Sequence, residues 1–317
     1  MGYATRLTLA GRHWTAQETP ARQGDMKTPL IGAVELGGTK INVGIGTGPG
    51  ELVATARIAT TTPEQSLGTV IDFFRANPPV AAVGIGSFGP VCLDPGSPAW
   101  GSITSTPKPG WAHVPVARTI GEALGVRVAF DTDVDVAALA EYRWGALAGC
   151  RTGLYLTVGT GIGGGVVIDG RPHHGMIHPE FGHIRVARTP GDDFPGICPF
   201  HGDCLEGLAS GPAIAARLGA SLSEGDLDDP RRAFIYDALG QALANFLLTL
   251  SPHRIVIGGG VAKAPGFHAM VHASMNRWIN GYLQAPQLDA DDYIVPPMLG
   301  DDAGVLGAIA LALDLPD

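Results

Sequence analysis

Two cysteines and two histidines in the middle of the chain have the types and spacing of a metal site. Cys198, His201 and Cys204 are three residues apart, and His183 lies upstream of them. Thiolate and imidazole are the usual ligands of tetrahedral zinc, and a tight turn can direct closely spaced side chains to one point. The sequence therefore predicts a zinc site with these four residues as ligands. Four protein ligands leave no open coordination position, so this zinc would be structural.

Two carboxylates flank the predicted zinc site. Glu180 lies shortly before His183, and Glu206 follows Cys204 closely. A closed metal site would hold both carboxylates in fixed positions, which is what a pocket for a polyol requires. The alternative is a Cys198–Cys204 disulfide or a pair of unused thiols. The nearby histidines and the lack of a recognisable secretion signal favour zinc.

Glycine-rich turns between apolar runs form a second group of candidates. Two matches to G-x-G-x-x-G, at residues 84–89 and 159–164, lack the helix that a dinucleotide site needs directly after the turn, and the sequence contains no P-loop pattern. Turns without Cβ atoms still let backbone N–H groups approach a phosphate. The turns at residues 37–40 and 159–161 each add a threonine hydroxyl, and a third glycine turn lies at 258–260. An ordinary hairpin turn is the alternative for any one of them.

An aspartate lies where a predicted strand meets a predicted helix. Asp133 follows the apolar run 126–130 and precedes an alanine-rich stretch. This is the usual place for a side chain that must point into a crevice. The alternative role is a helix N-cap, for which Asp131 and Thr132 compete. Three histidines upstream of Glu180 have no spacing that assigns them a role: His173, His174 and His178.

Apolar periodicity predicts alternating strands and helices. Two units, at residues 30–45 and 153–168, each consist of a strand, a glycine turn with a threonine and a returning strand, which indicates two similar half-domains that face one another. The second turn is expected to span residues 159–165. The remaining predictions are strands at 52–58, 80–85, 126–130 and 254–257, a long loop at 92–112, and helices at 66–75, 116–124, 134–144, about 207–219, 230–250, 266–280 and 303–313.

The composition excludes several classes of protein. The chain has 317 residues, 45% hydrophobic and 16% charged, which is typical of a globular protein with a sizeable core. A net charge of −9 argues against nucleic-acid binding. We find no signal-peptide pattern and no run near the ~20 apolar residues of a membrane span. We therefore expect a cytoplasmic protein without a membrane partner, with residues 1–26 as a loosely ordered extension.

Seven motifs together resemble the ROK family of sugar kinases and sugar-responsive repressors. They are Glu-Leu-Gly-Gly-Thr-Lys (35–40), Thr-Asp-Val-Asp (132–135), Gly-Thr-Gly-Ile-Gly-Gly-Gly (159–165), Pro-Glu-Phe-Gly-His (179–183), the Cys/His stretch (198–204), Cys-Leu-Glu (204–206) and Gly-Gly-Gly-Val (258–261). The resemblance covers about residue 28 to the C-terminus. The C-x-x-H-x-x-C spacing and a Glu at position 35 look most like the bacterial fructokinase branch.

The resemblance implies an α/β protein with the two-domain, actin-like ATPase (ribonuclease H-like) fold and an interdomain cleft. Residues 27–136 would form the N-terminal lobe, 137–300 the C-terminal lobe, and 301–317 a helix that returns to the N-terminal lobe. The loop from Gly86 to Trp111 would close over the sugar. The family usually forms homodimers, so a homodimer is expected.

The resemblance also implies a reaction and its residues: ATP-dependent phosphorylation of a hexose, with fructose favoured. Alternatives are glucose, mannose, an N-acetylated amino sugar, or a non-catalytic sugar sensor. Asp133 would be the general base, and Glu35 would orient Mg²⁺ through water. Nucleotide would contact Gly37, Gly38, Thr39, Lys40, Thr160, Gly161, Gly259 and Gly260, and sugar would contact Gly86, Thr132, Glu180, His183 and Glu206.

Two positions depart from the family pattern. Thr132-Asp133-Val134-Asp135 replaces the common Asn-Asp-Ala-Asn, which removes an amide that would bind a sugar hydroxyl. Glu35 is one methylene longer than the usual Asp, which changes how its carboxylate reaches a magnesium-bound water.

Overall fold

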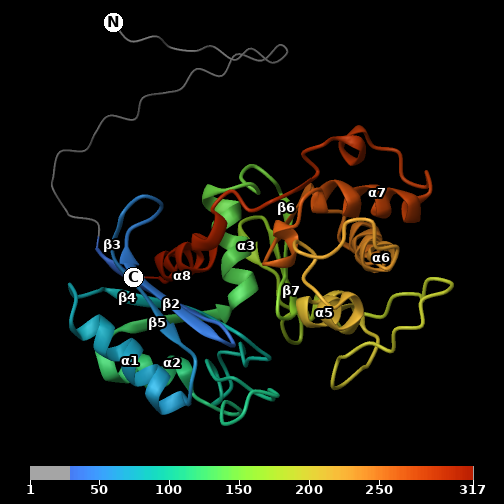
Figure 1. Cartoon of the computed structure of the whole chain (residues 1–317). Helices are drawn as coiled ribbons and strands as arrows, with labels where there is room; N and C mark the ends of the chain where they lie inside the picture. Colours follow the sequence, from blue (N-terminus) through green and yellow to red (C-terminus); the bar gives the residue numbers. More distant parts are fainter. Residues whose placement is uncertain (1–28, 317) are drawn as a thin grey trace, which may run out of the picture.

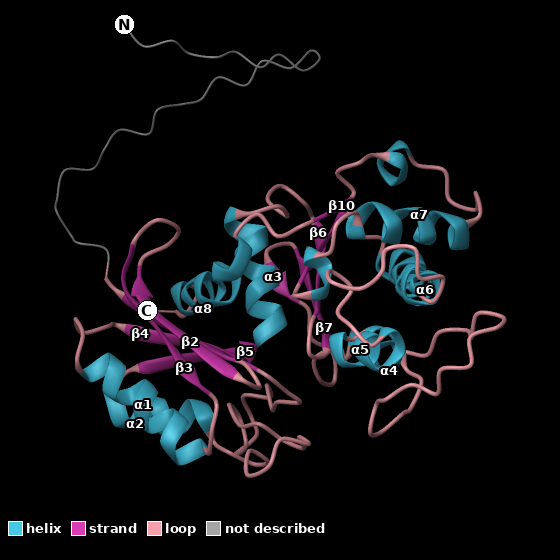
Figure 2. Cartoon of the chain, in the orientation of Figure 1, coloured by secondary structure: helices cyan, strands magenta, loops and turns pink. Residues whose placement is uncertain are grey.

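The structure, a computed structural model, describes residues 29–316 and contains two five-stranded mixed sheets with helices around and between them (Figures 1 and 2). The predicted extension at residues 1–26 lies outside the described residues. The α/β class expected from the sequence is confirmed, and each of the two strand–turn–strand units lies in its own sheet.

The first sheet has the strand order β3-β2-β1-β4-β5. Strands β1, β2 and β3 form an antiparallel meander, while β4 and β5 run parallel to β1. Nearly every side chain of β1 and β4 is buried, because helices cover both faces of these central strands. The edge strand β3 alternates between half-buried and exposed positions. The bounds are β1 (Ile31–Leu36), β2 (Lys40–Gly46), β3 (Leu52–Ala59), β4 (Ala82–Ser87) and β5 (Arg127–Thr132).

Helices α1 and α2 cover one face of the first sheet, and α8 covers the other (Figure 1). Thr62 caps α1, since its side chain accepts a hydrogen bond from the Gln65 N–H, and Pro63 fits the first helical turn. Gly125 ends α2 in the left-handed conformation. The bounds are α1 (Pro63–Arg75), α2 (Val116–Leu124) and α8 (Ala303–Leu313).

The second sheet has the order β10-β9-β6-β7-β8. Leu154 and Leu156 of β6 face a large core formed with α4 to α7, whereas Tyr155 faces α3. This alternation places helices on both faces of the sheet. The bounds are β6 (Thr152–Val158), β7 (Ile162–Ile168), β8 (Arg171–Pro172), β9 (Arg254–Gly258), β10 (Ile294–Val295), α4 (Leu205–Ala209), α5 (Gly211–Leu218), α6 (Arg232–Leu250) and α7 (Phe267–Ile279).

Helices α3 (Asp133–Trp144) and α8 pack against each other between the two sheets (Figure 1). The contact is close, because a Cβ atom at Gly307 would lie 1.8 Å from the Val136 carbonyl oxygen. Arg143 joins the two helices by donating to the Ala310 carbonyl and to Asp314. The buried carboxylate of Glu141 accepts hydrogen bonds from the backbone N–H groups of residues 146, 298 and 299. These bonds fix α3 to the segment that leads into α8.

Two predictions about local structure are wrong. The glycine run was expected to be a turn over residues 159–165, but β7 begins at Ile162. The reason is the packing of α3 against this strand. A Cβ atom at Gly165 would lie 2.7 Å from the Val134 carbonyl oxygen, so these glycines let α3 approach the strand. The helix expected over 207–219 is divided at Ser210, which caps α5 through the Ala213 N–H.

Helix α6 also corrects the expectation that no segment approaches the length of a membrane span. By length and composition alone it could cross a bilayer, but 67% of its most apolar window is buried inside the protein. It packs against α4 and α7 in the core of the second half. Its apolar composition is that of a core helix.

Candidate functional site

The parallel strands of the first sheet bring three predicted site positions together. Glu35 of β1 pairs with Gly86 of β4, and Gly86 pairs with Asp131 of β5. The chain then turns directly into α3, whose first residue is Asp133. Since the carboxyl ends of parallel strands meet at one sheet edge, Glu35 and Asp133 lie at the same edge. A Cβ atom at Gly86 would lie 3.2 Å from the Asp133 Cα, so glycine there allows α3 to start close to β4.

Asp133 has the electrostatics of a proton acceptor. Burial raises the pKa of its carboxyl to about 7, and the negative charges of Glu35, Asp135 and Glu180 act in the same direction. The backbone N–H of Val134 opposes the shift. A carboxyl with a pKa near neutrality can take up a proton from a reacting hydroxyl and release it again.

Glu35 is held from two sides. Asn42 of β2 donates a hydrogen bond to its Oε2 at 2.8 Å. A Cβ atom at Gly304, in the first turn of α8, would lie 2.3 Å from its carboxyl carbon, so the helix abuts the side chain. Burial raises the pKa of Glu35, while Asn42, Lys40 and Arg57 oppose the shift. The carboxylate is therefore positioned before any ligand is bound.

The first glycine hairpin is open to solvent. Gly37 closes the turn by donating to the Lys40 carbonyl at 3.0 Å, and the Thr60 hydroxyl donates to the Gly37 carbonyl. Gly38, Thr39 and Lys40 are exposed, and no heavy atom lies within 4 Å of a Cβ placed at Gly38. Backbone N–H groups and the Lys40 ammonium are thus available to an anion.

The second glycine hairpin is hydrogen-bonded to Glu206. The Ile162 N–H donates to Glu206 Oε2 at 2.9 Å, and a Cβ atom at Gly161 would lie 2.7 Å from the same oxygen. Thr160 at the tip of the turn is exposed. The predicted sugar-side carboxylate and the predicted phosphate hairpin are therefore in direct contact, a link that the sequence did not indicate.

The third glycine turn lies beside the second hairpin. Gly259 has a left-handed backbone (φ 89°) and sits against the Val158 carbonyl, where a Cβ atom would lie 2.3 Å from the oxygen. Gly260 is exposed, with open space at its Cβ position. A Cβ atom at Gly159 would lie 3.9 Å from the Gly260 nitrogen, so the two turns are neighbours.

The four predicted metal ligands converge. One donor atom from each of His183, Cys198, His201 and Cys204 lies within 4.8 Å of all the others. Cys198 Sγ lies 3.8 Å from His183 Nδ1 and 3.7 Å from His201 Nδ1, and Cys204 Sγ lies 3.6 Å from His183 Nδ1. In a tetrahedral site with zinc–sulfur and zinc–nitrogen bonds of about 2.3 and 2.0 Å, sulfur and nitrogen are about 3.5 Å apart. The cluster therefore has the dimensions of a zinc site, and both cysteines are free thiols.

Glu180 and His183 flank a single turn of 3₁₀ helix, η1 (Phe181–His183). The His183 N–H donates to the Glu180 carbonyl, so the backbone fixes their spacing. Burial raises the pKa of Glu180, and Glu206 and Asp135 add to the shift, whereas His178 and His183 oppose it. Because His183 directs Nδ1 to the two thiols, its Nε2 stays available on the other side of the ring.

The Thr132 hydroxyl forms its hydrogen bonds within the protein. Its hydroxyl donates to Asp135 Oδ2 at 2.8 Å and accepts from the Asp135 N–H at 3.0 Å. It is the N-cap of α3, the role for which the sequence offered several candidates. A buried hydroxyl with both bonds made is poorly suited to the sugar contact that the resemblance implied for this position.

Two of the unassigned histidines are part of the site. His174 Nε2 lies 3.0 Å from Asp131 Oδ1 and 3.5 Å from Asp135 Oδ2, and these hydrogen bonds raise the pKa of His174 to about 10. His178 is buried and contacts Val91 and Glu180. No spacing rule could indicate either residue, since their partners are distant in sequence or appear only in the folded chain.

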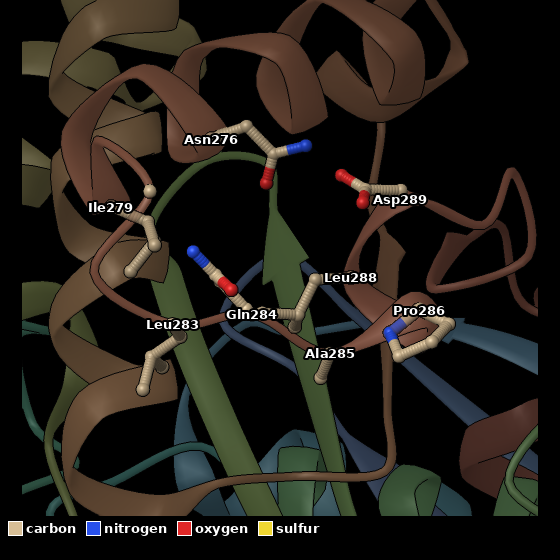
Figure 3. Close-up of a pocket in the computed structure, with 9 residues that line it drawn as sticks. Asn276, Ile279, Leu283, Gln284, Ala285, Pro286, Leu288 and Asp289 are labelled. Carbon is tan, nitrogen blue, oxygen red and sulfur yellow. The ribbon is translucent and has the colours of Figure 1, made fainter.

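A pocket of about 500 Å³ lies away from these residues, at the C-terminal end of α7 (Figure 3). Asn276, Gln284 and Asp289 supply its polar groups, and leucine, isoleucine, alanine and proline side chains supply the rest. It shares no lining residue with the sites described above.

Comparison with known proteins identifies the family. The chain matches the ROK family over residues 31–315, and it belongs to that family. It is 47% identical to a fructokinase of Zymomonas mobilis, with 90% of this chain and 96% of that protein covered. It is 42% identical to a putative fructokinase of Bacillus subtilis, with 89% and 95% covered.

A solved structure confirms the fold expected from the resemblance. A ROK family glucokinase from Streptomyces griseus, in complex with glucose and AMPPNP, superposes with a TM-score of 0.70 at 27% identity, covering 90% of this chain and all of that one. The chain therefore has the two-domain, actin-like ATPase fold of ROK sugar kinases.

Proposed function

We propose that the protein is a fructokinase that transfers the γ-phosphoryl group of ATP to fructose and yields fructose 6-phosphate. The observation that carries this proposal is the 47% and 42% identity to two proteins named fructokinase or putative fructokinase over about nine-tenths of the chain. The arrangement of Asp133, Glu35 and the glycine hairpins supports it, because phosphoryl transfer requires mainly positioning and charge stabilisation.

Asp133 is the general base of the proposed reaction. It accepts the proton of the attacking hydroxyl, and its pKa of about 7 suits that task near neutral pH. The hairpins at residues 37–40 and 159–161 bind the phosphates through backbone N–H groups, with the Thr39 and Thr160 hydroxyls as further donors. The turn at Gly259 and Gly260 borders the adenosine.

Magnesium would be held near Glu35. The carboxylate is already oriented by Asn42, and carboxylate with water and phosphate oxygens is the ligand set that Mg²⁺ prefers. When bound, the ion neutralises charge that develops on the phosphate oxygens. Within the protein, Glu35 would orient the ion, and Lys40 would add a positive charge at the same hairpin.

The sugar side of the site comprises Glu180, His183 and Glu206. Two carboxylates accept hydrogen bonds from hydroxyl groups, and His183 Nε2 faces away from the thiols. Since Glu206 also accepts from the Ile162 N–H, it would transmit the position of the sugar to the second phosphate hairpin. Gly86 serves the site by letting α3 begin close to β4.

The Cys/His cluster would hold a structural zinc ion. His183, Cys198, His201 and Cys204 fit the ion in donor type, number and spacing. Four protein ligands exclude substrate from the metal, so its contribution is to fix the loop that carries Glu180 and Glu206. His183 would thereby contact both the metal and the sugar.

The two halves of the chain would act as lobes that close on the sugar. In this proposal the lobes would be residues 27–136 and 137–300, and the segment 301–317, which includes α8 (Ala303–Leu313), would return to the first lobe. Closure excludes water and suppresses ATP hydrolysis. A homodimer in the cytoplasm remains our prediction for the assembly and location.

The proposal is tested by ATP-dependent phosphorylation of fructose, glucose, mannose and N-acetylated amino sugars under identical conditions. We expect the highest kcat/KM for fructose. A higher value for another hexose would change the assigned substrate but would leave the assignment as a sugar kinase in place. Sugar binding without phosphorylation of any of them would instead indicate a sugar sensor.

A further inference from the structure

His178 connects the two halves of the protein. It follows β8 in the second half, and its side chain is only 3% exposed. The backbone N–H of Val91, in the loop after β4 of the first half, donates to His178 Nε2 at 3.1 Å. On the opposite side of the ring, Nδ1 lies 3.5 Å from Glu180 Oε1.

These contacts determine the protonation of the ring. A ring nitrogen that accepts a hydrogen bond from a backbone N–H cannot itself carry a proton. His178 is therefore neutral with its proton on Nδ1, the nitrogen that lies 3.5 Å from Glu180 Oε1. One nitrogen accepts a hydrogen bond from the first half, and the other carries the proton and lies beside the Glu180 carboxylate.

Both partners of His178 are held in place by the backbone. Val91 pairs with Ile103 across the loop, and the Thr104 N–H and hydroxyl both donate to the Pro90 carbonyl. On the other side, Pro179 separates His178 from Glu180 and restricts the backbone between them. A shift of the loop at Val91 would thus move the imidazole and, through it, the Glu180 carboxylate.

We propose that His178 is a positioning residue that couples the loop containing Val91 to Glu180, so that fructose affinity depends on contact between the two halves. The proposal rests on the proposed function and deepens it, since it names a residue that holds the sugar-binding carboxylate. The donor at Nδ1 keeps Glu180 oriented as an acceptor for a hydroxyl group. The 3.5 Å separation leaves room for the contact to shorten when the sugar binds.

Three substitutions separate the two contacts of His178. His178→Asn keeps a donor near the Nδ1 position but removes the acceptor for Val91. His178→Gln keeps an acceptor near the Nε2 position but removes the donor for Glu180. His178→Phe removes both and fills the space. The exposed His173 on the same segment provides the matched control, His173→Gln.

Kinetics test the coupling. In His178→Phe, KM for fructose should rise about ten- to hundred-fold, the range for a lost hydrogen bond to a charged group, with KM for ATP within about twofold of wild type. The Asn and Gln variants should show smaller increases, and His173→Gln none. In a Glu180→Gln background, His178→Phe should add little, because the two residues act as one unit. Equal increases in both KM values, or an unchanged KM for fructose, would overturn the proposal.

The tautomer of His178 can be measured independently of catalysis. Long-range ¹⁵N–¹H NMR of histidine-labelled wild-type protein should show His178 as the Nδ1–H tautomer, assigned by its loss in His178→Gln. An Nε2–H tautomer or an imidazolium at neutral pH would overturn the coupling even if the enzyme is a fructokinase. Conversely, an inert wild type with the Nδ1–H tautomer would refute the proposed function and leave only the contacts of His178 supported.

Discussion

The two sides of the candidate site are held by different means. On the first side, β1, β4 and β5 place Glu35 and Asp133 by strand register, so the hydrogen bonds of a sheet fix their positions. On the second side, Glu180, His183 and Glu206 lie on short turns around four converging thiol and imidazole groups. In the proposed function, the sheet edge carries the chemistry and the Cys/His region carries the binding of the sugar. Substitutions on the two sides should therefore change kcat and KM separately.

The largest effect is expected at the sheet edge. Asp133→Asn removes the general base and should lower kcat by about 10²–10⁴-fold, with KM for fructose nearly unchanged. Asp131→Asn is the matched control two residues away, because its amide oxygen can still accept from the Thr132 N–H. Steady-state kinetics with both variants test the assignment. Losses of similar size in the two variants would show that the effect is structural.

The Cys/His region should respond through binding and stability. Cys204→Ala should lose the zinc that we expect at about one ion per chain, lower the melting temperature, and raise KM for fructose more than KM for ATP. Elemental analysis, thermal unfolding and kinetics measure the three effects. Cys150→Ala, outside the cluster, should keep the metal. A metal-free, fully active wild type, or a Cys198–Cys204 disulfide detected by mass spectrometry, would refute the site.

The pH dependence of kcat should report the sheet edge. Since burial raises the pKa of Asp133 to about 7, the base becomes protonated below that pH, and kcat/KM should fall about tenfold per pH unit there. KM for fructose should change much less than kcat over the same range. A pH–rate profile between pH 5 and 8 measures both. A profile that stays flat down to pH 5 would exclude Asp133 as the group that titrates.

The same pKa shift predicts the stability of the Asp133→Asn protein. A carboxyl whose folded pKa lies above its usual value of 3.8 favours folding below that value and loses the contribution as pH rises through about 7. At pH 8 the wild type therefore holds a charge that the fold disfavours. Asp133→Asn should melt at the same temperature as wild type or slightly higher. A clear decrease would mean that the carboxylate also supports the fold.

The sequence predicted the sheet edge better than the Cys/His side. Apolar runs located β1, β4 and β5, and a strand–helix junction identified Asp133, because register and periodicity are local properties of the chain. The four residues that converge in the Cys/His cluster were also predicted from spacing. The contact between Glu206 and the Ile162 N–H was not, since it joins residues 44 apart through folding alone. The contacts of His178 were not predicted for the same reason, because its partner Val91 is 87 residues away.

The glycine run at residues 159–165 was predicted to be a turn throughout, and part of that prediction is wrong. Its residues have the composition of a turn, yet Gly163 to Gly165 form part of a strand. They are glycines because α3 lies against them, and a Cβ atom at Gly163 would meet the Val134 side chain at 2.9 Å. A local rule for turns cannot detect a helix that arrives from another part of the chain. Thr132 was similarly placed in the sugar site because of its motif, whereas its hydroxyl caps α3.

The smallest effect we predict is a change of shape that involves both sides of the site. If the sheet edge and the Cys/His side close on the sugar, the radius of gyration from small-angle scattering should decrease when fructose and a non-hydrolysable nucleotide are added together. Asp133→Asn should close like wild type, because it keeps the sugar contacts and lacks only the base. Glu180→Gln should require more fructose to reach the same radius, because it weakens the sugar side. An unchanged radius in wild type at saturating ligand would contradict closure, and equal behaviour of the two variants would contradict the division of roles between the two sides.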